Sequence, residues 1–208
     1  MYHVITSGSA GNAVLYFDNI LVDVGVPYSS IQPFIRDIQL VFISHVHHDH
    51  FNIETIRRIQ FERPTVRFAV GRWMVDYMDG IKNIDILDLF KWYDYGSFKM
   101  ALIKLYHDVE TAGVRIWKDG KKIIHATDTK TLEGIEAKEY DLYAIESNYD
   151  AETIQERIDR KIAAGEFAYE KGSVNSHLSE QQCNDFFYRN RKEDSILVRL
   201  HESKNNSL

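Results

Sequence analysis

Six consecutive residues hold the densest group of chemically active side chains in the sequence. They read His45-Val46-His47-His48-Asp49-His50 and follow the apolar run from Ile38 to Ile43. Imidazole nitrogens and carboxylate oxygens bind zinc and related divalent cations, and a loop leaving a strand can bring several of them together. The pattern therefore indicates a metal site that includes His45, His47, Asp49 and His50. A solvent-exposed polar turn is the alternative interpretation.

The spacing His-x-His-x-Asp-His resembles the signature of metallo-β-lactamase-fold hydrolases. In that family the first two histidines bind one metal ion and the Asp-His pair binds a second. His48 falls where the pattern accepts any residue, so it is not assigned as a ligand. The segment Ser7-Gly8-Ser9-Ala10-Gly11-Asn12 resembles the Gly-Ser-x-Gly-Asn opening of the same family; without the family it is a strand connection.

Further ligands are expected where other predicted strands end, because the histidine loop itself directly follows a strand. His107, Asp128 and His201 each follow such a run. Loops at strand ends gather at one edge of a sheet, where functional residues concentrate. Taken singly, each of the three is more often a structural residue. The remaining ligands of the family are likewise a His, a bridging Asp and a late His. The resemblance thus implies one metal on His45, His47 and His107, a second on Asp49, His50 and His201, and Asp128 between them.

Two cations about 3.5–4 Å apart lower the pKa of a bridging water, so that hydroxide forms near neutral pH. Asp49 is assigned a catalytic role as well, because its second oxygen can orient that hydroxide. Mixed imidazole and carboxylate ligands favour Zn²⁺, with Mn²⁺ or Fe²⁺ as alternatives. Because the nucleophile is hydroxide, Cys183 is not required and is predicted to be a packing residue.

A hydrolase also needs a group that protonates the leaving group. His177 precedes a predicted helix rather than following a strand, which favours a role other than metal ligand. The macrodipole at a helix N-terminus disfavours imidazolium, and a neighbouring carboxylate would restore it. Glu146, at the end of the strand from Asp141 to Ile145, is placed to supply that carboxylate. The alternative is that His177 only flanks the helix cap.

Several segments narrow the resemblance to YycJ-like proteins, metallo-β-lactamase-fold enzymes described as DNA exonucleases. They are Glu146-Ser147-Asn148-Tyr149-Asp150, Ser176-His177-Leu178-Ser179, His201-Glu202-Ser203-Lys204-Asn205-Asn206, His107-Asp108 and Thr127-Asp128-Thr129. In the related ribonuclease Z branch a Glu-His pair protonates the leaving alkoxide, so the resemblance implies that role for Glu146 and His177. The chain departs from the group at Lys130, Tyr149 and Ser176, which bears on substrate size and direction of cleavage.

The whole chain, residues 1–208, is predicted to form one domain. Its 208 residues suit a single core, its one cysteine excludes an intramolecular disulfide, and hydrophobic residues make up 44%. Strands grouped around helices in two similar halves suggest an α+β, four-layer αβ/βα sandwich, and the resemblance implies the metallo-β-lactamase fold. A short run of strands opens the chain. Helices are predicted after Pro27 through about Arg36 and near Trp73 to Met78, and a Ser-Glu-Gln-Gln capping box is predicted to begin another at Ser179. The absence of a leader or of an apolar run near 20 residues predicts a cytoplasmic protein with no membrane partner.

The sequence favours a dinuclear metal phosphodiesterase or nuclease, with DNA or RNA as substrate. A net charge of −6 is unusual for a protein that binds nucleic acid. Two basic groups could still provide a local path, although each is more simply a solvated surface: Arg57, Arg58, Arg63 and Arg67; and Arg115, Lys118, Lys121 and Lys122. A small-molecule hydrolase, such as a cyclic nucleotide phosphodiesterase or a lactonase, is the main alternative. A non-catalytic metal-binding module is a third hypothesis.

Overall fold

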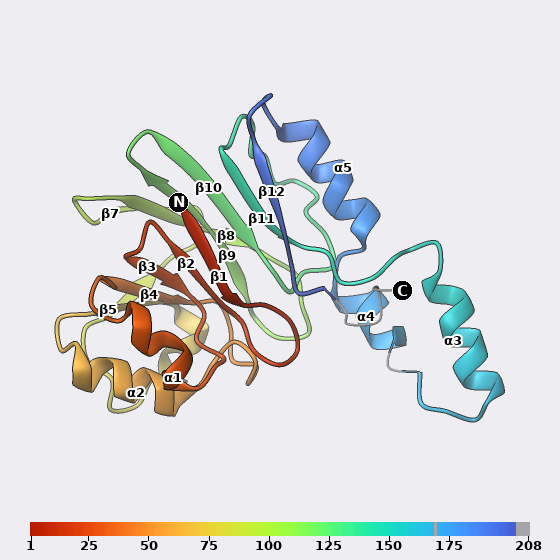
Figure 1. Ribbon diagram of the computed structural model, residues 1–208, viewed down its shortest axis with the longest axis horizontal. Coiled ribbons are helices and arrows are strands. Elements are labelled where there is room, and N and C mark those ends of the chain that lie inside the picture. Colours follow the sequence, from red (N-terminus) through yellow and green to blue (C-terminus); the bar gives the residue numbers. More distant parts are fainter. Residues whose placement is uncertain (169, 203–208) are drawn as a thin grey trace. The chain divides into compact units, whose positions relative to one another are not determined.

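The computed structural model describes residues 1–168 and 170–202, and Ser203 to Asn206 of the last YycJ-like segment lie outside them. The chain forms two compact units, Met1–Lys91 and Trp92–Leu208. Each unit is built on its own six-stranded mixed sheet with helices, so the α+β class is confirmed. Figure 1 shows the first sheet in red to yellow and the second in green to blue.

The first unit begins with an antiparallel meander and continues as a parallel sheet. Its strands lie in sequence order: β1 (Tyr2–Thr6), β2 (Ala13–Tyr16), β3 (Ile20–Val22), β4 (Leu40–Ile43), β5 (Arg67–Gly71) and β6 (Ile84–Leu87). Strands β3 to β6 run parallel to one another. The connections contain α1 (Tyr28–Ile31), η1 (Gln32–Phe34), α2 (Ile53–Glu62) and η2 (Arg72–Tyr77).

Helix α2 fixes the far end of the histidine loop. Asn52 caps the helix, since its side chain accepts a hydrogen bond from the backbone N–H of Thr55. Ile56 and Ile59, three residues apart, are fully buried in the hydrophobic core of this unit. The loop 44–52 is therefore anchored by a buried strand at one end and a capped, packed helix at the other.

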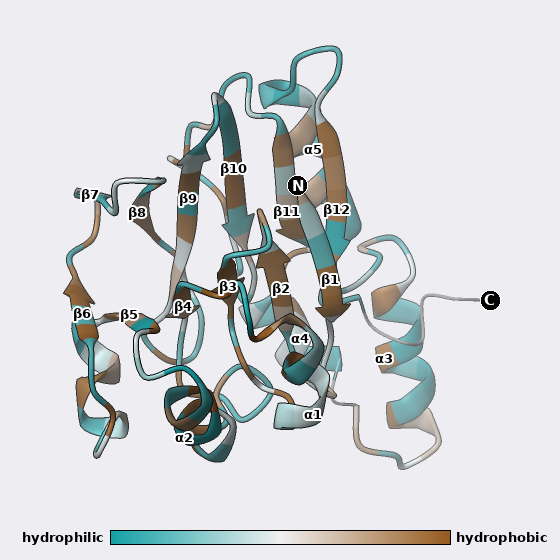
Figure 2. Ribbon diagram, turned by 60° about the vertical axis from the view of Figure 1, so that its left-hand side comes forward, coloured by the Kyte–Doolittle hydropathy of each residue, from teal (hydrophilic) through white to brown (hydrophobic). Residues whose placement is uncertain are grey.

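The second unit also mixes parallel and antiparallel pairs. Its strand order is β12 (Ile196–Leu200), β11 (Leu142–Glu146), β10 (Lys121–Ala126), β9 (Ala112–Lys118), β8 (Lys99–Lys104) and β7 (Trp92–Asp94). Strands β10, β11 and β12 are parallel, so their carboxyl ends share one edge of the sheet. The helices are α3 (Ile154–Ala163), α4 (Glu170–Ser176) and α5 (Glu180–Asn190). In Figure 2, apolar residues dominate β2, whereas α2 and α3 alternate between apolar and polar residues.

Helix α5 covers the second sheet. The predicted capping box is confirmed, because Ser179 accepts from the Gln182 backbone while the Gln182 side chain accepts from the Ser179 backbone. Cys183 and Phe186 pack against the strand residue Tyr143 in one core cluster. Burial raises the pKa of the Cys183 thiol to about 12, which keeps it protonated and unreactive. The prediction that Cys183 is a packing residue is therefore confirmed.

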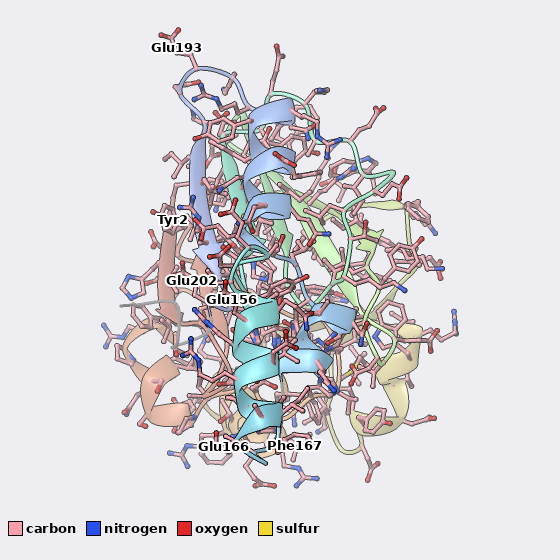
Figure 3. The ribbon with its side chains drawn as sticks, turned by 90° about the vertical axis from the view of Figure 1, so that its right-hand side faces the viewer. Tyr2, Glu156, Glu166, Phe167, Glu193 and Glu202 are labelled. Atoms are coloured by element: carbon pink, nitrogen blue, oxygen red, sulfur yellow. The ribbon has the colours of Figure 1, made fainter. Side chains whose placement is uncertain are left out.

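Helix α3 packs through a small cluster of its own. Ile154 and Ile158 of the helix contact Tyr149 and Ala168. Figure 3 shows Glu156 on this helix, with Phe167 at its lower end. Phe167 is 87% exposed and is not part of this cluster, although the next residue, Ala168, is.

Local structure differs from the sequence-based prediction in a few elements. The helix expected after Pro27 divides into α1 and η1, because Pro33 lacks the N–H that a continuous helix needs. The helix expected near Trp73 is a 3₁₀ helix, η2. Among the described helices, none combines the length and the apolar character that would let it cross a membrane.

Candidate metal centre

The histidine loop begins one residue after β4, and its members differ in exposure. His45 and His50 are completely buried, His47 and Asp49 are partly buried, and His48 is exposed, as its exclusion from the predicted ligands requires. The backbone N–H groups of His50 and Phe51 both donate to the His47 carbonyl, at 2.9 and 2.8 Å. This tight turn brings the two ends of the motif together.

Asp23 organises the histidines of this loop, although the sequence did not identify it as a site residue. Its Oδ2 accepts from His50 Nδ1 at 2.7 Å and from the Ser44 hydroxyl at 3.0 Å, and its Oδ1 accepts from the Ser44 backbone N–H at 2.8 Å. The Ser44 oxygen in turn lies 2.9 Å from His45 Nδ1. Because the single Ser44 hydrogen goes to Asp23, His45 Nδ1–H must donate to Ser44.

These hydrogen bonds fix the tautomers of both buried histidines. With hydrogen on Nδ1, His45 and His50 each keep a lone pair on Nε2, the arrangement typical of metal-binding histidines. A third ring nitrogen, His47 Nδ1, lies 3.2 Å from His45 Nε2. The ring centroids of His45 and His50 are 4.3 Å apart. The first unit thus presents imidazole lone pairs that converge on a small volume.

Gly25 allows the chain to pass closely behind Asp49. A Cβ built on Gly25 would lie 1.9 Å from the carbonyl carbon and oxygen of Asp49, a contact that no side chain tolerates. The Gly25 N–H donates to the Asn12 carbonyl at 3.1 Å, and the Asn12 N–H donates to the Asp49 carbonyl at 2.6 Å. The backbones of Asn12 and Gly25 therefore pack directly against the peptide group between Asp49 and His50.

The second unit gathers its own predicted ligands around Asp128. One oxygen of Asp128 lies 3.6 Å from His107 Nε2, and the other lies 3.8 Å from His201 Nε2. His107 Nδ1 donates to the Ser176 carbonyl at 3.0 Å, and His107 Nε2 lies 3.0 Å from the Asp108 carboxylate. His201 is held by Asn148, whose amide nitrogen is 3.0 Å from His201 Nδ1 and 3.1 Å from the His201 carbonyl. The two carboxylate oxygens of Asp128 therefore face different histidines.

The buried Glu146 pairs with the partly buried His177 beside this cluster. His177 Nδ1 donates to Glu146 Oε1, while Glu146 Oε2 accepts the backbone N–H groups of Thr129 and Leu178 at 3.0 and 3.3 Å. One donor atom from each of Asp128, Glu146, His177 and His201 lies within 4.8 Å of the others. The structure thus brings Glu146 and His177 together, as the sequence predicted, and their catalytic role stays a prediction.

The surroundings of His177 set its charge. Burial alone would lower the pKa of His177, but the hydrogen bond and negative charge of Glu146, with Asp128 and Asp108 nearby, raise it above its usual value. The His177 ring is 4.9 Å from the ring of His107 and stacks at 5.2 Å on the ring of His201. The geometry favours an imidazolium whose free Nε2–H points away from Glu146.

Three of the organising residues adopt the left-handed backbone conformation. Asp23, Asp128 and His201 have φ angles of 61°, 55° and 52°. Non-glycine residues seldom adopt this conformation, and they concentrate at functional sites. Each turns the chain sharply where its strand has ended.

Sequence reasoning missed Asp23, Asn12 and Asn148 as members of the site. Asp23 directly follows β3 and so satisfies the same strand-end rule that selected Asp128 and His201. Asn12 and Asn148 lie in segments that were recognised by resemblance without a role for either residue. The signal for Asp23 was therefore present, whereas the two asparagines act through hydrogen bonds that no spacing reveals.

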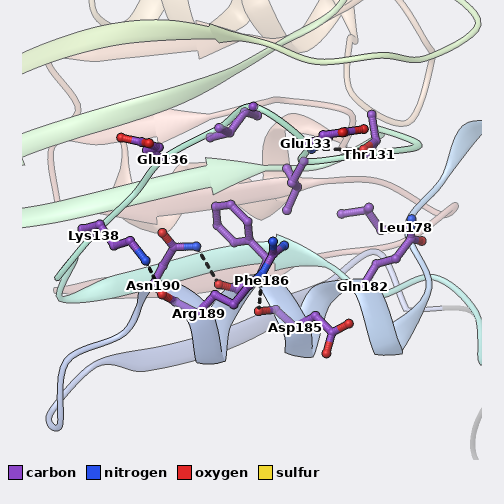
Figure 4. Close-up of a pocket in the computed structure, with 13 residues that line it drawn as sticks. Thr131, Glu133, Glu136, Lys138, Leu178, Gln182, Asp185, Phe186, Arg189 and Asn190 are labelled. Carbon is purple, nitrogen blue, oxygen red and sulfur yellow. Dashed lines mark hydrogen bonds between the residues drawn. The ribbon is translucent and has the colours of Figure 1, made fainter.

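A pocket of about 550 Å³ lies elsewhere in the second unit, between residues 131–138 and α5. Figure 4 shows Phe186, Arg189 and Asn190 on its helical side, opposite Glu133 and Glu136. Its lining includes Leu178, the neighbour of His177. Among the described residues, those that line this pocket include none of the nine predicted site residues, so the imidazole clusters are separate from it.

The predicted ligands are divided between the two units. His45, His47, Asp49 and His50 belong to the first, and His107, Asp128 and His201 belong to the second. Within each unit the predicted residues lie together. Neither cluster includes His3, which is exposed on β1 beside Phe34, or the core residue His125.

Comparisons with known proteins match this arrangement of elements. Residues 18–179 match a family model described as a beta-lactamase superfamily domain. A search of curated proteins gave no match. Solved structures that are similar include the metallo-beta-lactamase fold protein YhfI from Bacillus subtilis, with 16% identity and a TM-score of 0.73 over 98% of this chain and 86% of that chain. Human tRNase Z, short form, is 17% identical with a TM-score of 0.66 over 99% of this chain and 93% of that chain. The predicted metallo-β-lactamase fold is therefore confirmed.

Proposed function

The chain belongs to the beta-lactamase superfamily, and from this premise we propose that it is a dinuclear metal-dependent phosphodiesterase that cleaves DNA or RNA. Hydrolysis is the general activity of the family, and the His and Asp clusters are suited to metal binding. The proposal adds the number of metals, the phosphodiester substrate and the residues that act on it.

The donor atoms fit a divalent cation. His45 and His50 each direct a lone-pair-bearing Nε2 away from a partner that holds the opposite nitrogen, and the Ser176 carbonyl likewise holds His107 Nδ1. Such partners orient metal-binding histidines and raise their basicity. Asp128 offers one oxygen toward His107 and the other toward His201, as a bridging carboxylate does. Imidazoles and carboxylates together favour Zn²⁺, with Mn²⁺ or Fe²⁺ as alternatives.

We assign His45, His47 and His107 to one cation, Asp49, His50 and His201 to the other, and Asp128 to both. This assignment requires the two units to contribute to one centre, and it is supported by the complete set of seven ligands that the family resemblance implies. Bound cations would supply a reactive hydroxide from water and would stabilise negative charge on the phosphate oxygens.

The observation that carries the phosphodiesterase proposal is the Glu146–His177 pair. Glu146 is fully buried and held by two backbone N–H groups, so it keeps His177 Nδ1 in one orientation. His177 can then deliver its Nε2 proton to an alkoxide leaving group, which is the poor leaving group of a phosphodiester.

The choice of nucleic acid over a small phosphodiester rests on resemblance. The segments around Glu146, His177 and His201 resemble YycJ-like exonucleases, and one similar structure is named tRNase Z. The acidic net charge of −6 favours a small substrate instead. We therefore keep a cyclic nucleotide phosphodiesterase as the second candidate. A reducing, cytoplasmic location is part of the proposal and is consistent with the single buried thiol of Cys183.

A substrate panel tests the proposal. Purified protein with Zn²⁺ or Mn²⁺ is incubated with end-labelled single- and double-stranded DNA and RNA, cyclic nucleotides and a lactone. We expect the polynucleotides to be shortened by wild-type protein and by the control His3→Ala, and to remain intact with His177→Ala. Turnover of cyclic nucleotides alone would select the second candidate. Cleavage of none of these substrates would overturn the proposal.

A further inference from the structure

We propose that Asn12 is a positioning residue that holds Asp49 and His50 together before a cation binds them, and that its side-chain N–H leaves His50 Nε2 when the cation arrives. The inference rests on the proposed metal centre and adds a residue that no spacing in the sequence assigns to it. All of the contacts that carry it lie within the first unit.

The hydrogen on the His50 ring is located by its partner. Asp23 is a buried carboxylate, which only accepts hydrogen bonds when ionised, and it lies 2.7 Å from His50 Nδ1. The hydrogen is therefore on Nδ1, and Nε2 carries a lone pair. A group in contact with Nε2 must then be a hydrogen-bond donor or a cation.

The Asn12 side chain meets this lone pair with its amide hydrogen. Its Oδ1 accepts the Gly8 backbone N–H at 2.9 Å and faces the Ser7 hydroxyl at 3.3 Å, which assigns the oxygen and nitrogen of the amide. The amide nitrogen consequently lies on the other side, 2.9 Å from His50 Nε2 and 3.4 Å from Asp49 Oδ2. Asn12 also reaches the carbonyls of Gly8 and Asp49, both at 3.2 Å.

The Asn12 amide thus occupies the direction from which a cation would approach its two ligands. Asp49 Oδ2 and His50 Nε2 are 3.6 Å apart, and the partial positive charge of one NH₂ group faces both. Two acceptors so close would repel each other without an intervening donor. The amide hydrogens provide part of the attraction that a cation provides in full, so the ligand pair is already assembled in the metal-free protein. The same hydrogens compete with the cation for the lone pair.

The Asn12→Asp variant separates this role from a merely structural one. It keeps the size of the side chain and an oxygen for the Gly8 N–H, but it replaces the donor with an acceptor. Without metal, a third acceptor then faces Asp49 and His50, and the melting temperature should fall. With Zn²⁺, the added carboxylate should raise affinity for the more weakly held equivalent by about tenfold, because carboxylate count tunes cation affinity.

Asn19→Asp is the matched control. Asn19 is also buried in the first unit, and its amide donates to the Gln39 side chain at 3.0 Å. This variant should lose stability equally with and without zinc. The measurements are thermal unfolding in chelator and in excess Zn²⁺, and a stepwise zinc titration against a chromophoric chelator. A second variant, Asn12→Ala, is compared with wild type in chelator by long-range ¹H–¹⁵N NMR of the histidine rings, where the Nε2 resonance of His50 should shift as its hydrogen bond is lost.

The outcomes distinguish this inference from the proposed function. The role of Asn12 would be overturned, and the metal centre would stand, in either of two cases. Wild type and Asn12→Asp would bind two zinc equivalents with the same affinities, or the His50 resonance would be unchanged in Asn12→Ala. Wild-type protein that binds no zinc would overturn the proposed function and the Asn12 role together. A gain in zinc affinity that is confined to Asn12→Asp would support both the metal centre and the role of Asn12.

Discussion

The carboxylate of Asp23 lies 2.7 Å from His50 Nδ1, and through the Ser44 hydroxyl it also sets the tautomer of His45. One buried anion thereby orients two imidazoles that leave the same loop. Neither imidazole could adopt the opposite tautomer without losing a hydrogen bond in a site closed to water. Asp23 is thus as much a part of the proposed metal centre as the ligands, although we expect it to touch no cation.

Replacing Asp23 with Asn should weaken metal binding by about 10–100-fold, the usual effect of removing a partner of a metal-binding histidine. Asn tolerates the left-handed backbone at this position, so the variant should fold. Zinc affinity is measured by chelator competition. Asp18→Asn is the control, since Asp18 has a φ angle of 63° and is exposed. Equal zinc affinities in both variants and wild type would contradict the role of Asp23.

His177→Ala should lower turnover by about 10²–10⁴-fold, the range for loss of a general acid, while zinc content stays constant. Because Glu146 and His177 act as one unit, the double variant with Glu146→Gln should be no slower than the slower single variant. The measurements are kcat on the best substrate of the panel and metal content by elemental analysis. Unchanged kcat in His177→Ala would remove this residue from the mechanism.

Gly25→Ala should destabilise the protein by about 3 kcal/mol, because the new methyl group would overlap the Asp49 carbonyl. Gly172→Ala is the matched control in α4, where nothing lies within 4 Å of the added Cβ. This control should be neutral or gain about 0.5–1 kcal/mol from helix propensity. Urea unfolding measures both. Similar midpoints for the two variants would show that the Asp49 backbone can move away.

Asp141 should make the free energy of unfolding depend on pH in the acid range. Burial opposes its ionisation, but Lys192, the Lys122 backbone and Lys121 outweigh this and lower its pKa from 3.8 to about 2. A carboxyl whose pKa is lower in the folded state stabilises the protein above about pH 4 and loses this contribution as pH falls toward 2. Since the lysines are partly exposed, we expect about 1–2 kcal/mol. Asp141→Asn should remove that share of the acid dependence of urea unfolding between pH 5 and pH 2.5, and an identical dependence in wild type and variant would refute it.

From the sequence we could propose the metal ligands, but not the residues that hold them in place. His107, Asp128 and His201 follow buried strands, and this placement can be read from apolar runs alone. Asp23, Asn12 and Asn148 act through hydrogen bonds between segments distant in the chain. Only the folded backbone shows that Asn12 reaches His50, 38 positions away.

The missed elements also have physical causes. The strand β7 has three residues, too few for a period to be detected. The helix α4 reads Glu-Lys-Gly-Ser-Val-Asn-Ser, and most of these residues favour helices weakly. An ion pair of 2.5 Å between Glu170 and Lys161 of α3 holds its first residue in place.

The left-handed turns at Asp23, Asp128 and His201 imply a conflict between folding stability and the proposed function. Each such residue costs on the order of 1 kcal/mol relative to a glycine at the same φ. Glycine at these positions would relax the backbone but remove the oxygen or nitrogen on which the centre depends. A laboratory selection for thermal stability alone should therefore favour glycine at these positions, and such variants should lose metal binding. Variants from such a selection should be tested for metal binding at every round.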